Sequence, residues 1–134
     1  MTLKTPDRNN IINYRRERAY STLEEAKYNI QAKYWNLVAN RMYYAVFYMC
    51  MALLLSNKIN ATTHAGVKSM MGLHFIKPQI LSMEDGELLS LLFSMRQTGD
   101  YDDLFDWKEE NILPVIPQVE ALIKKIDGLI KLED

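Results

Sequence analysis

The sequence is poor in the residues that build metal centres, disulfides and tight turns. Its 134 residues include one cysteine, two histidines, five glycines and four prolines. One cysteine cannot form an intramolecular disulfide, and the two histidines, His64 and His74, have none of the short spacings that metal sites use. Scarce glycine and proline, together with the lack of alternating β-branched runs, favour helices over strands. We therefore expect an all-α protein that carries no metal or other cofactor.

Positive and negative charges are nearly balanced. Lysine and arginine number 16, aspartate and glutamate number 17, and the formal net charge is −1. Such a balance gives no global attraction to nucleic acid, so any contact of that kind needs a local patch. The segment from Met1 to Arg8 lacks the apolar core of a signal peptide, and Cys50 lies inside an apolar run. We expect a cytoplasmic protein that does not enter a membrane.

The stretch from Met42 to Leu55 contains no charged residue. It is shorter than the roughly 20 apolar residues that cross a membrane. Extending it backwards takes in Arg41, Asn40 and Asn36, which a lipid-facing helix does not favour. A soluble helix that is apolar on all sides is the one that its neighbours surround. This stretch predicts the central helix of the protein.

Apolar residues recur at steps of three and four in four other segments, which is the spacing of one face of a helix. No internal repeat, low-complexity tract or linker divides the chain. We therefore expect one domain over residues 1–134, an up-and-down bundle of four to five helices, with a flexible arm over residues 1–6. The four segments span residues 12–30, 67–75, 88–95 and 112–129.

Three local signals mark expected helix ends. Asp7 is suited to cap the first helix, and Thr62 or Thr63 to cap the helix after the central one. Gly99 follows the apolar segment 88–95 and predicts a left-handed stop there.

The histidines and a basic cluster are the first candidates for chemistry. His64 falls at a helix start, where it is expected to be exposed and titratable. His74 falls on an apolar face, which favours a core or interface histidine over a metal ligand. Arg15, Arg16 and Arg18 form a basic cluster on the first helix. This cluster is either a solvated helix end or a patch for a phosphate or a partner.

The segment from Arg96 to Asp102 leaves two interpretations open. In the structural one, Arg96 pairs with Asp100 and locks the helix end, while Tyr101 folds back on the bundle. In the functional one, Arg96 binds a phosphate or a phosphodiester, and Tyr101 stacks or hydrogen-bonds beside it.

Several segments in order resemble the HEPN superfamily, the higher eukaryotes and prokaryotes nucleotide-binding domain. The similarity is to its small single-domain bacterial and archaeal branch, and it covers nearly the whole chain. The segments are Leu23-Glu24-Glu25-Ala26, residues 39–47 (ANRMYYAVF), residues 63–67 (THAGV), residues 72–75 (GLHF) and residues 96–102 (RQTGDYD).

The resemblance implies a bundle of four to five helices that pairs into a homodimer across its central helices. It also implies a metal-independent RNase, often a toxin beside a small nucleotidyltransferase, whose arginine is followed after four to six residues by a histidine. Arg96 matches the arginine, but Tyr101, Asp102 and Asp103 stand where the histidine belongs. Tyrosine, with a pKa of about 10, and aspartate, with a pKa of about 4, are poor proton-transfer groups near neutral pH.

We therefore expect a HEPN-type module that binds a nucleotide, RNA or a nucleotidyltransferase partner in a toxin–antitoxin-like pair. One alternative is an RNase toxin that uses Arg96 with His64, and another is a purely structural interaction module. No metal ligands are expected, and the enzyme question stays open. The expected ligand-binding residues are Arg96, Asp100, Tyr101, Arg41 and Tyr44.

Overall fold

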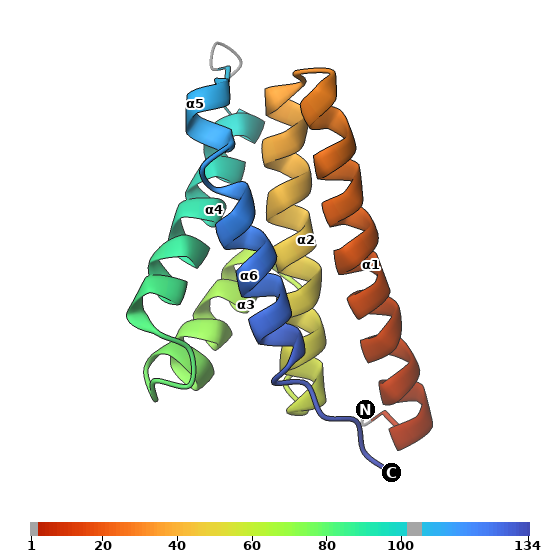
Figure 1. Cartoon of the computed structure of the whole chain (residues 1–134). Helices are drawn as coiled ribbons and strands as arrows, with labels where there is room; N and C mark the ends of the chain where they lie inside the picture. Colours follow the sequence, from red (N-terminus) through yellow and green to blue (C-terminus); the bar gives the residue numbers. More distant parts are fainter. Residues whose placement is uncertain (1–2, 102–105) are drawn as a thin grey trace.

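The computed structural model of the chain describes residues 3–101 and 106–134, with the side chains of residues 99–101 outside that description. All described regular elements are helical, which confirms the all-α bundle. Figure 1 shows α1 and α2 side by side, α4 on the far side of α2, and α6 crossing in front of α2. The elements are α1 (Thr5–Gln31), α2 (Trp35–Ser56), α3 (His64–Met71), the π-helix η1 (Gly72–Ile76), α4 (Met83–Tyr101), α5 (Glu109–Ile112) and α6 (Ile116–Asp127).

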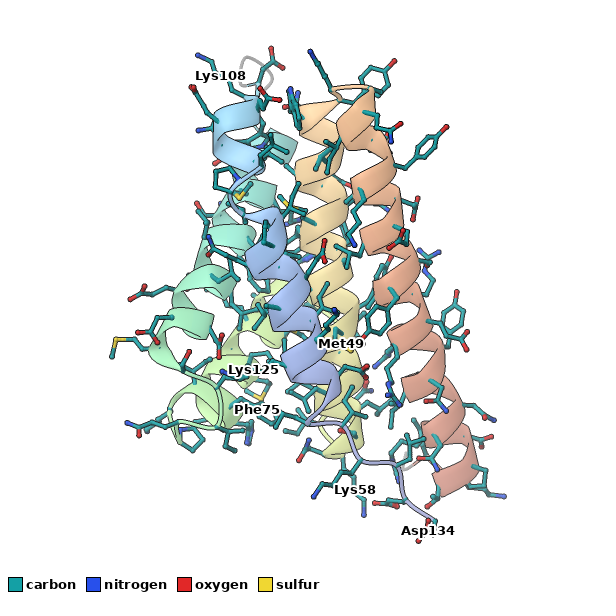
Figure 2. The ribbon with its side chains drawn as sticks, in the orientation of Figure 1. Met49, Lys58, Phe75, Lys108, Lys125 and Asp134 are labelled. Atoms are coloured by element: carbon teal, nitrogen blue, oxygen red, sulfur yellow. The ribbon has the colours of Figure 1, made fainter. Side chains whose placement is uncertain are left out.

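Helix α2 is the central helix that the apolar run predicted. It is long and apolar enough to cross a membrane by length and composition, yet 72% of its most apolar window is buried inside the bundle. Met49, labelled at the middle of the bundle in Figure 2, is fully buried. This is the pattern of a core helix in a soluble protein, because the neighbouring helices already cover its apolar surface.

The start of α1 differs from the prediction. The helix begins at Thr5 with Pro6 in its first turn and Lys4 at the N-cap position, so Asp7 is not its cap. Thr5 and Pro6 belong to the helix and not to the arm expected over residues 1–6. Proline is well suited to the first turn, because its missing N–H would have had no partner there.

The third helix starts as predicted and then changes its winding. Thr63 is the N-cap of α3, and its Oγ1 accepts a hydrogen bond from the Gly66 N–H at 3.0 Å. A Cβ on Gly66 would lie 2.7 Å from that same Oγ1, so the glycine leaves room for the cap. After Met71 the chain continues as the π-helix η1. His74 lies in η1 and is exposed, so the core alternative for His74 is wrong, whereas the interface alternative stays a prediction.

Gly99 does not end a helix, whereas Pro114 does. Helix α4 runs through Gly99 to Tyr101, and no described glycine has a positive φ, so the expected left-handed stop at Gly99 is wrong. Glycine permits a left-handed turn but does not force one. Pro114 lies between α5 and α6, where it interrupts what would otherwise be one long helix.

Charged and polar side chains tie the helices together at their edges. Asp127 on α6 accepts a hydrogen bond from Arg16 Nε at 2.6 Å and another from the Tyr20 hydroxyl at 2.7 Å. Lys125, also on α6, pairs with Asp85 of α4 at 2.5 Å (Figure 2). Both faces of α6 are thereby fixed, one to α1 and the other to α4.

The basic cluster on α1 is used for internal contacts. Arg15 Nη1 donates to the carbonyl oxygen of Met51 at 3.3 Å, and Arg18 Nη2 donates to the Tyr48 hydroxyl at 3.2 Å. Arg16 is held by Asp127. Each of the three guanidinium groups thus contacts a neighbouring helix. Binding of a phosphate or a partner by this cluster stays a prediction.

The Tyr20 contact predicts how stability changes at high pH. Burial, followed by the hydrogen bond to Asp127, raises the pKa of Tyr20 from 10.0 to about 12. Between these values the unfolded chain has already lost the proton that the folded chain keeps, so raising the pH lowers the free energy of unfolding. Urea unfolding of the wild type and of Tyr20→Phe, at about pH 9 and about pH 11, measures this loss of unfolding free energy. The stability advantage of the wild type is expected to shrink at the higher pH.

The exposed Tyr28 provides the matched control on the same helix. Its replacement by phenylalanine should leave the pH dependence as in the wild type. The prediction is contradicted if the difference in unfolding free energy between the wild type and Tyr20→Phe is the same at both pH values.

Candidate functional site

Tyr43 of α2 lies at the centre of the candidate site. Its side chain is 1% exposed, and its hydroxyl forms a hydrogen bond with Nδ1 of His64, the first residue of α3. The guanidinium carbon of Arg96, on α4, lies 6.0 Å from the centroid of the Tyr43 ring, and the Phe93 ring meets it edge-on at 5.1 Å. One tyrosine thus brings together Arg96 and His64, which lie 32 residues apart in the sequence.

The helical repeat of α4 explains why Arg96 points inward. Leu89, Leu92 and Arg96 follow one another at steps of three and four, so they share one face of the helix. Leu89 and Leu92 are 4% and 1% exposed. The same face therefore carries the half-buried Arg96 side chain toward α2.

A cavity of about 330 Å³ opens beside this cluster. It lies between α3 and α4, and none of the described residues that line it is acidic. The Lys68 ammonium lies 5.9 Å from the centroid of the Phe93 ring at its wall. Two cations, a histidine and several hydroxyl or amide groups make it a polar cavity of positive local potential. The lining residues are His64, Ala65, Lys68, Ser90, Phe93, Ser94, Arg96 and Gln97.

A second cavity, of about 290 Å³, also has Arg96 in its wall. The Asn36 side chain fixes its wall, because its Nδ2 donates to Asp106 Oδ1 at 2.9 Å and its Oδ1 accepts from the Trp107 N–H at 2.7 Å. Here too, none of the described lining residues is acidic. They are Asn36, Leu37, Ala39, Asn40, Met95, Arg96 and Trp107.

Arg41 and Tyr44 border the site from the exposed side of α2. The Arg41 guanidinium lies 5.4 Å from the Tyr44 ring centroid and donates twice to Asn40 Oδ1, at 3.0 and 2.8 Å. The Tyr44 ring centroid is 5.9 Å from that of His64. Arg41 therefore reaches the site through Asn40, which lines a cavity with Arg96, whereas Tyr44 reaches it through His64.

Comparison with known proteins assigns this arrangement to a family. A sequence model described as the HEPN domain matches residues 12–129, which is most of the chain. The chain belongs to the HEPN domain family. The resemblance deduced from its motifs is therefore confirmed.

Three relatives of this HEPN protein span most of its length. A UPF0332 protein of Thermotoga maritima is 34% identical over 93% of this chain and 95% of its own length. Two proteins of Methanocaldococcus jannaschii, both named as candidate toxins, are 35% and 30% identical. The first similarity covers 70% of this chain and 64% of the relative, and the second covers 86% and 85%.

Two expected site residues of the HEPN motif fall outside what the structure describes. Asp100 and Tyr101 belong to the last turn of α4, but their side chains are not described. The pairing of Arg96 with Asp100 and the position of the Tyr101 ring therefore stay predictions.

One site residue, Asn36, lies outside the motifs, whereas Asn40, Tyr43 and Phe47 belong to the segment 39–47 that resembles the family. Asn36, Asn40, Tyr43 and Phe47 follow one another at steps of four, three and four along α2. This spacing places a polar and aromatic stripe on a helix that otherwise looks uniformly apolar. Trp107 had no such signal, because its contact with Asn36 joins segments that are far apart in the chain.

Other parts of this HEPN fold are less suited to catalysis or to binding a charged ligand. Burial raises the pKa of the Cys50 thiol to about 12, so it stays protonated and is a poor nucleophile. Among the described residues, no three His, Cys, Asp or Glu side chains gather as a metal site would require. A groove of about 590 Å³ between η1 and α4 is larger, but it is mostly apolar and lacks both Arg96 and His64.

The Tyr43–His64 hydrogen bond gives a direct test of the site geometry. Tyr43→Phe removes the hydroxyl that holds Nδ1, which is expected to cost about 1–2 kcal/mol of unfolding free energy. It should also shift the NMR signals of the His64 ring. Urea unfolding and histidine-selective NMR measure the two effects.

Tyr44→Phe is the matched control, since Tyr44 is the next residue on α2 and contacts Arg41 through its ring. The exposed His74 provides an internal reference, because its signals should stay in place. Equal shifts of both histidines would contradict the assigned contact.

Proposed function

We propose that this HEPN protein binds RNA at the pocket formed by Arg96, His64 and Tyr43. The observation that carries the proposal is the meeting of Arg96 and His64 around one buried tyrosine, beside a cavity whose described walls hold no acidic residue. A chain with net charge −1 gains no general attraction to nucleic acid. A local pocket with Arg96 and Lys68 supplies the attraction that the total charge does not.

The combination of an arginine with aromatic side chains favours a nucleotide over a simple anion. Arg96 provides a planar donor group that matches the oxygen atoms of a phosphate. Aromatic side chains stand beside it, and base stacking on aromatic rings is the usual way in which proteins hold unpaired RNA bases. Arg41 and Tyr44 extend the same combination of cation and ring along α2.

Family membership and the names of the relatives support a toxin-like role in RNA metabolism. Two relatives are named as candidate toxins. We accordingly place this protein in the cytoplasm, where its RNA ligands would be. A small nucleotidyltransferase as its partner remains a proposal that rests on the HEPN resemblance.

A homodimer is also part of the proposal. Leu37, Arg41, Tyr44 and Tyr48 form a stripe on α2 that the other helices leave partly exposed. Its steps of four, three and four match the seam through which two helices pack. Pairing of two copies through this stripe would agree with the resemblance, which implies a homodimer across the central helices.

Arg96→Ala tests RNA binding. Loss of the guanidinium is expected to weaken the affinity for a single-stranded RNA oligomer by about ten-fold or more, because a charge-assisted phosphate contact disappears. Fluorescence anisotropy at fixed salt measures the affinity, and urea unfolding checks the fold. Arg18→Ala is the matched control, since Arg18 also lies over a tyrosine ring but contacts Tyr48 instead of the pocket.

Loss of stability without any loss of RNA affinity would favour the purely structural alternative. Failure of the wild type to bind RNA at all would reject the proposed function. Equal weakening by Arg18→Ala would place the RNA elsewhere on the protein.

A second candidate function is cleavage of RNA without a metal ion. The specific observation is that Arg96 and His64 line the same cavity within one chain. Arg96 would hold the phosphodiester, and His64 would transfer a proton to or from an oxygen atom. Because Tyr43 engages Nδ1 of His64, this transfer would fall to Nε2.

Incubation of the protein with RNA, in a buffer whose EDTA removes metal ions, tests this second function. His64→Ala should lower the cleavage rate by about 10²–10⁴-fold, the range in which general acid–base groups contribute. His74→Ala is the matched control, because His74 lies on the exposed side of η1. Cleavage that survives His64→Ala would rule out this mechanism, and RNA binding without any cleavage would leave the first proposal alone.

A further inference from the structure

We propose that Arg96 is the centre of a two-sided site that holds a dinucleotide step of single-stranded RNA. The phosphate would lie on the guanidinium, with one nucleoside in each of the two flanking cavities. This inference rests on the proposed RNA-binding function and adds the part of the ligand that the site recognises.

The two cavities share a single lining residue. Arg96 lines both the cavity beside His64 and the cavity beside Trp107, and no other described residue lines both. Their volumes, about 330 and 290 Å³, lie near the lower end of small-molecule sites. Each therefore suits one nucleoside, and the residue between them suits the phosphate that links two.

An aromatic side chain stands in the wall of each cavity. On one side the wall includes Phe93 and His64, which both contact the Tyr43 ring. On the other side it includes Trp107, whose backbone N–H is fixed by Asn36. Stacking on each side would supply affinity from the ring face, which every base has.

The cavities differ in their hydrogen-bonding groups. Ser94 and Gln97 line the His64 side and provide both donors and acceptors. Asn40 lines the Trp107 side, and its Oδ1 already accepts two bonds from Arg41, which leaves its amide N–H groups for a ligand. The Trp107 side should therefore favour a base edge with acceptors, and the two nucleosides should not be equivalent.

The charges around Arg96 also fit one linking phosphate. Arg96 is the only cation among the described lining residues of the Trp107 side, and Lys68 is the other cation on the His64 side. None of the described residues in either wall is acidic. Asp106, which Asn36 binds, lies behind the wall of the Trp107 side, so the cation at the centre is the group in these walls that attracts the phosphate.

Binding of small RNA fragments tests the inference. The probes are AMP, UMP, and the dinucleoside monophosphates ApA, UpU, ApU and UpA, with affinities measured by calorimetry. The dinucleoside monophosphates are expected to bind about ten-fold or more tightly than either mononucleotide, because each side contributes a stacked base. ApU and UpA should differ from one another, because the two sides carry different polar groups.

Trp107→Ala should lower the affinity for the dinucleoside monophosphates to about that of a mononucleotide and leave mononucleotide binding nearly unchanged. Trp107→Phe should restore most of the affinity, since it keeps an aromatic ring. Trp35→Phe is the control, because Trp35 is the other tryptophan and is not among the described lining residues of either cavity, although it lines an adjacent pocket with Trp107. It also leaves Trp107 as the sole tryptophan, whose fluorescence should be quenched by a dinucleoside monophosphate.

The outcomes separate this inference from the proposed function. Equal affinities for mononucleotides and dinucleoside monophosphates, or no quenching of Trp107, would overturn the two-sided site while RNA binding through Arg96 still stood. Absence of binding by every probe and by longer RNA would reject both. If Trp107→Ala unfolds, the wild-type comparison of probes and the quenching experiment still decide the question.

Discussion

The burial of α2 is the constraint on which the rest of the bundle depends. Its apolar surface runs around the whole helix from Val38 to Leu55, so α1, α3, α4 and α6 must cover it from several directions (Figure 1). The amide and charged side chains of α2, Asn36, Asn40 and Arg41, all occur in its N-terminal half. The candidate site lies where the covering helices meet that half, so its position follows from the same burial that stabilises the fold.

The features set by short-range periodicity could be predicted from the sequence. The central helix, the apolar face of α1 with Ala19, Leu23 and Ala26 buried, and the Thr63 cap all follow from residues within a few turns of one another. Helix periodicity is local, so one sequence is sufficient to recognise it. Arg96 was also identified, because it continues an apolar face and matches a HEPN motif.

The features that depend on how helices cross could not be predicted. The approach of His64 to Arg96 requires the angle between α3 and α4 and the position of Tyr43, none of which a local pattern contains. His74 was expected on an apolar face but lies exposed in the π-helix η1. The end of α4 was misplaced at Gly99 because glycine allows a stop without requiring one. In each case a tertiary contact or a backbone choice outweighed the local signal.

The cap of α3 makes two positions of this protein interdependent in evolution. The Thr63 hydroxyl and a Cβ at position 66 would occupy the same space, since they would be 2.7 Å apart. Alanine at position 66 therefore requires the Thr63 hydroxyl to rotate out of the cap or to be removed. His64 lies between them and takes its place from the same turn. A larger residue at position 66 would thus disturb the turn that carries His64 without contacting the ring of His64 or of Tyr43.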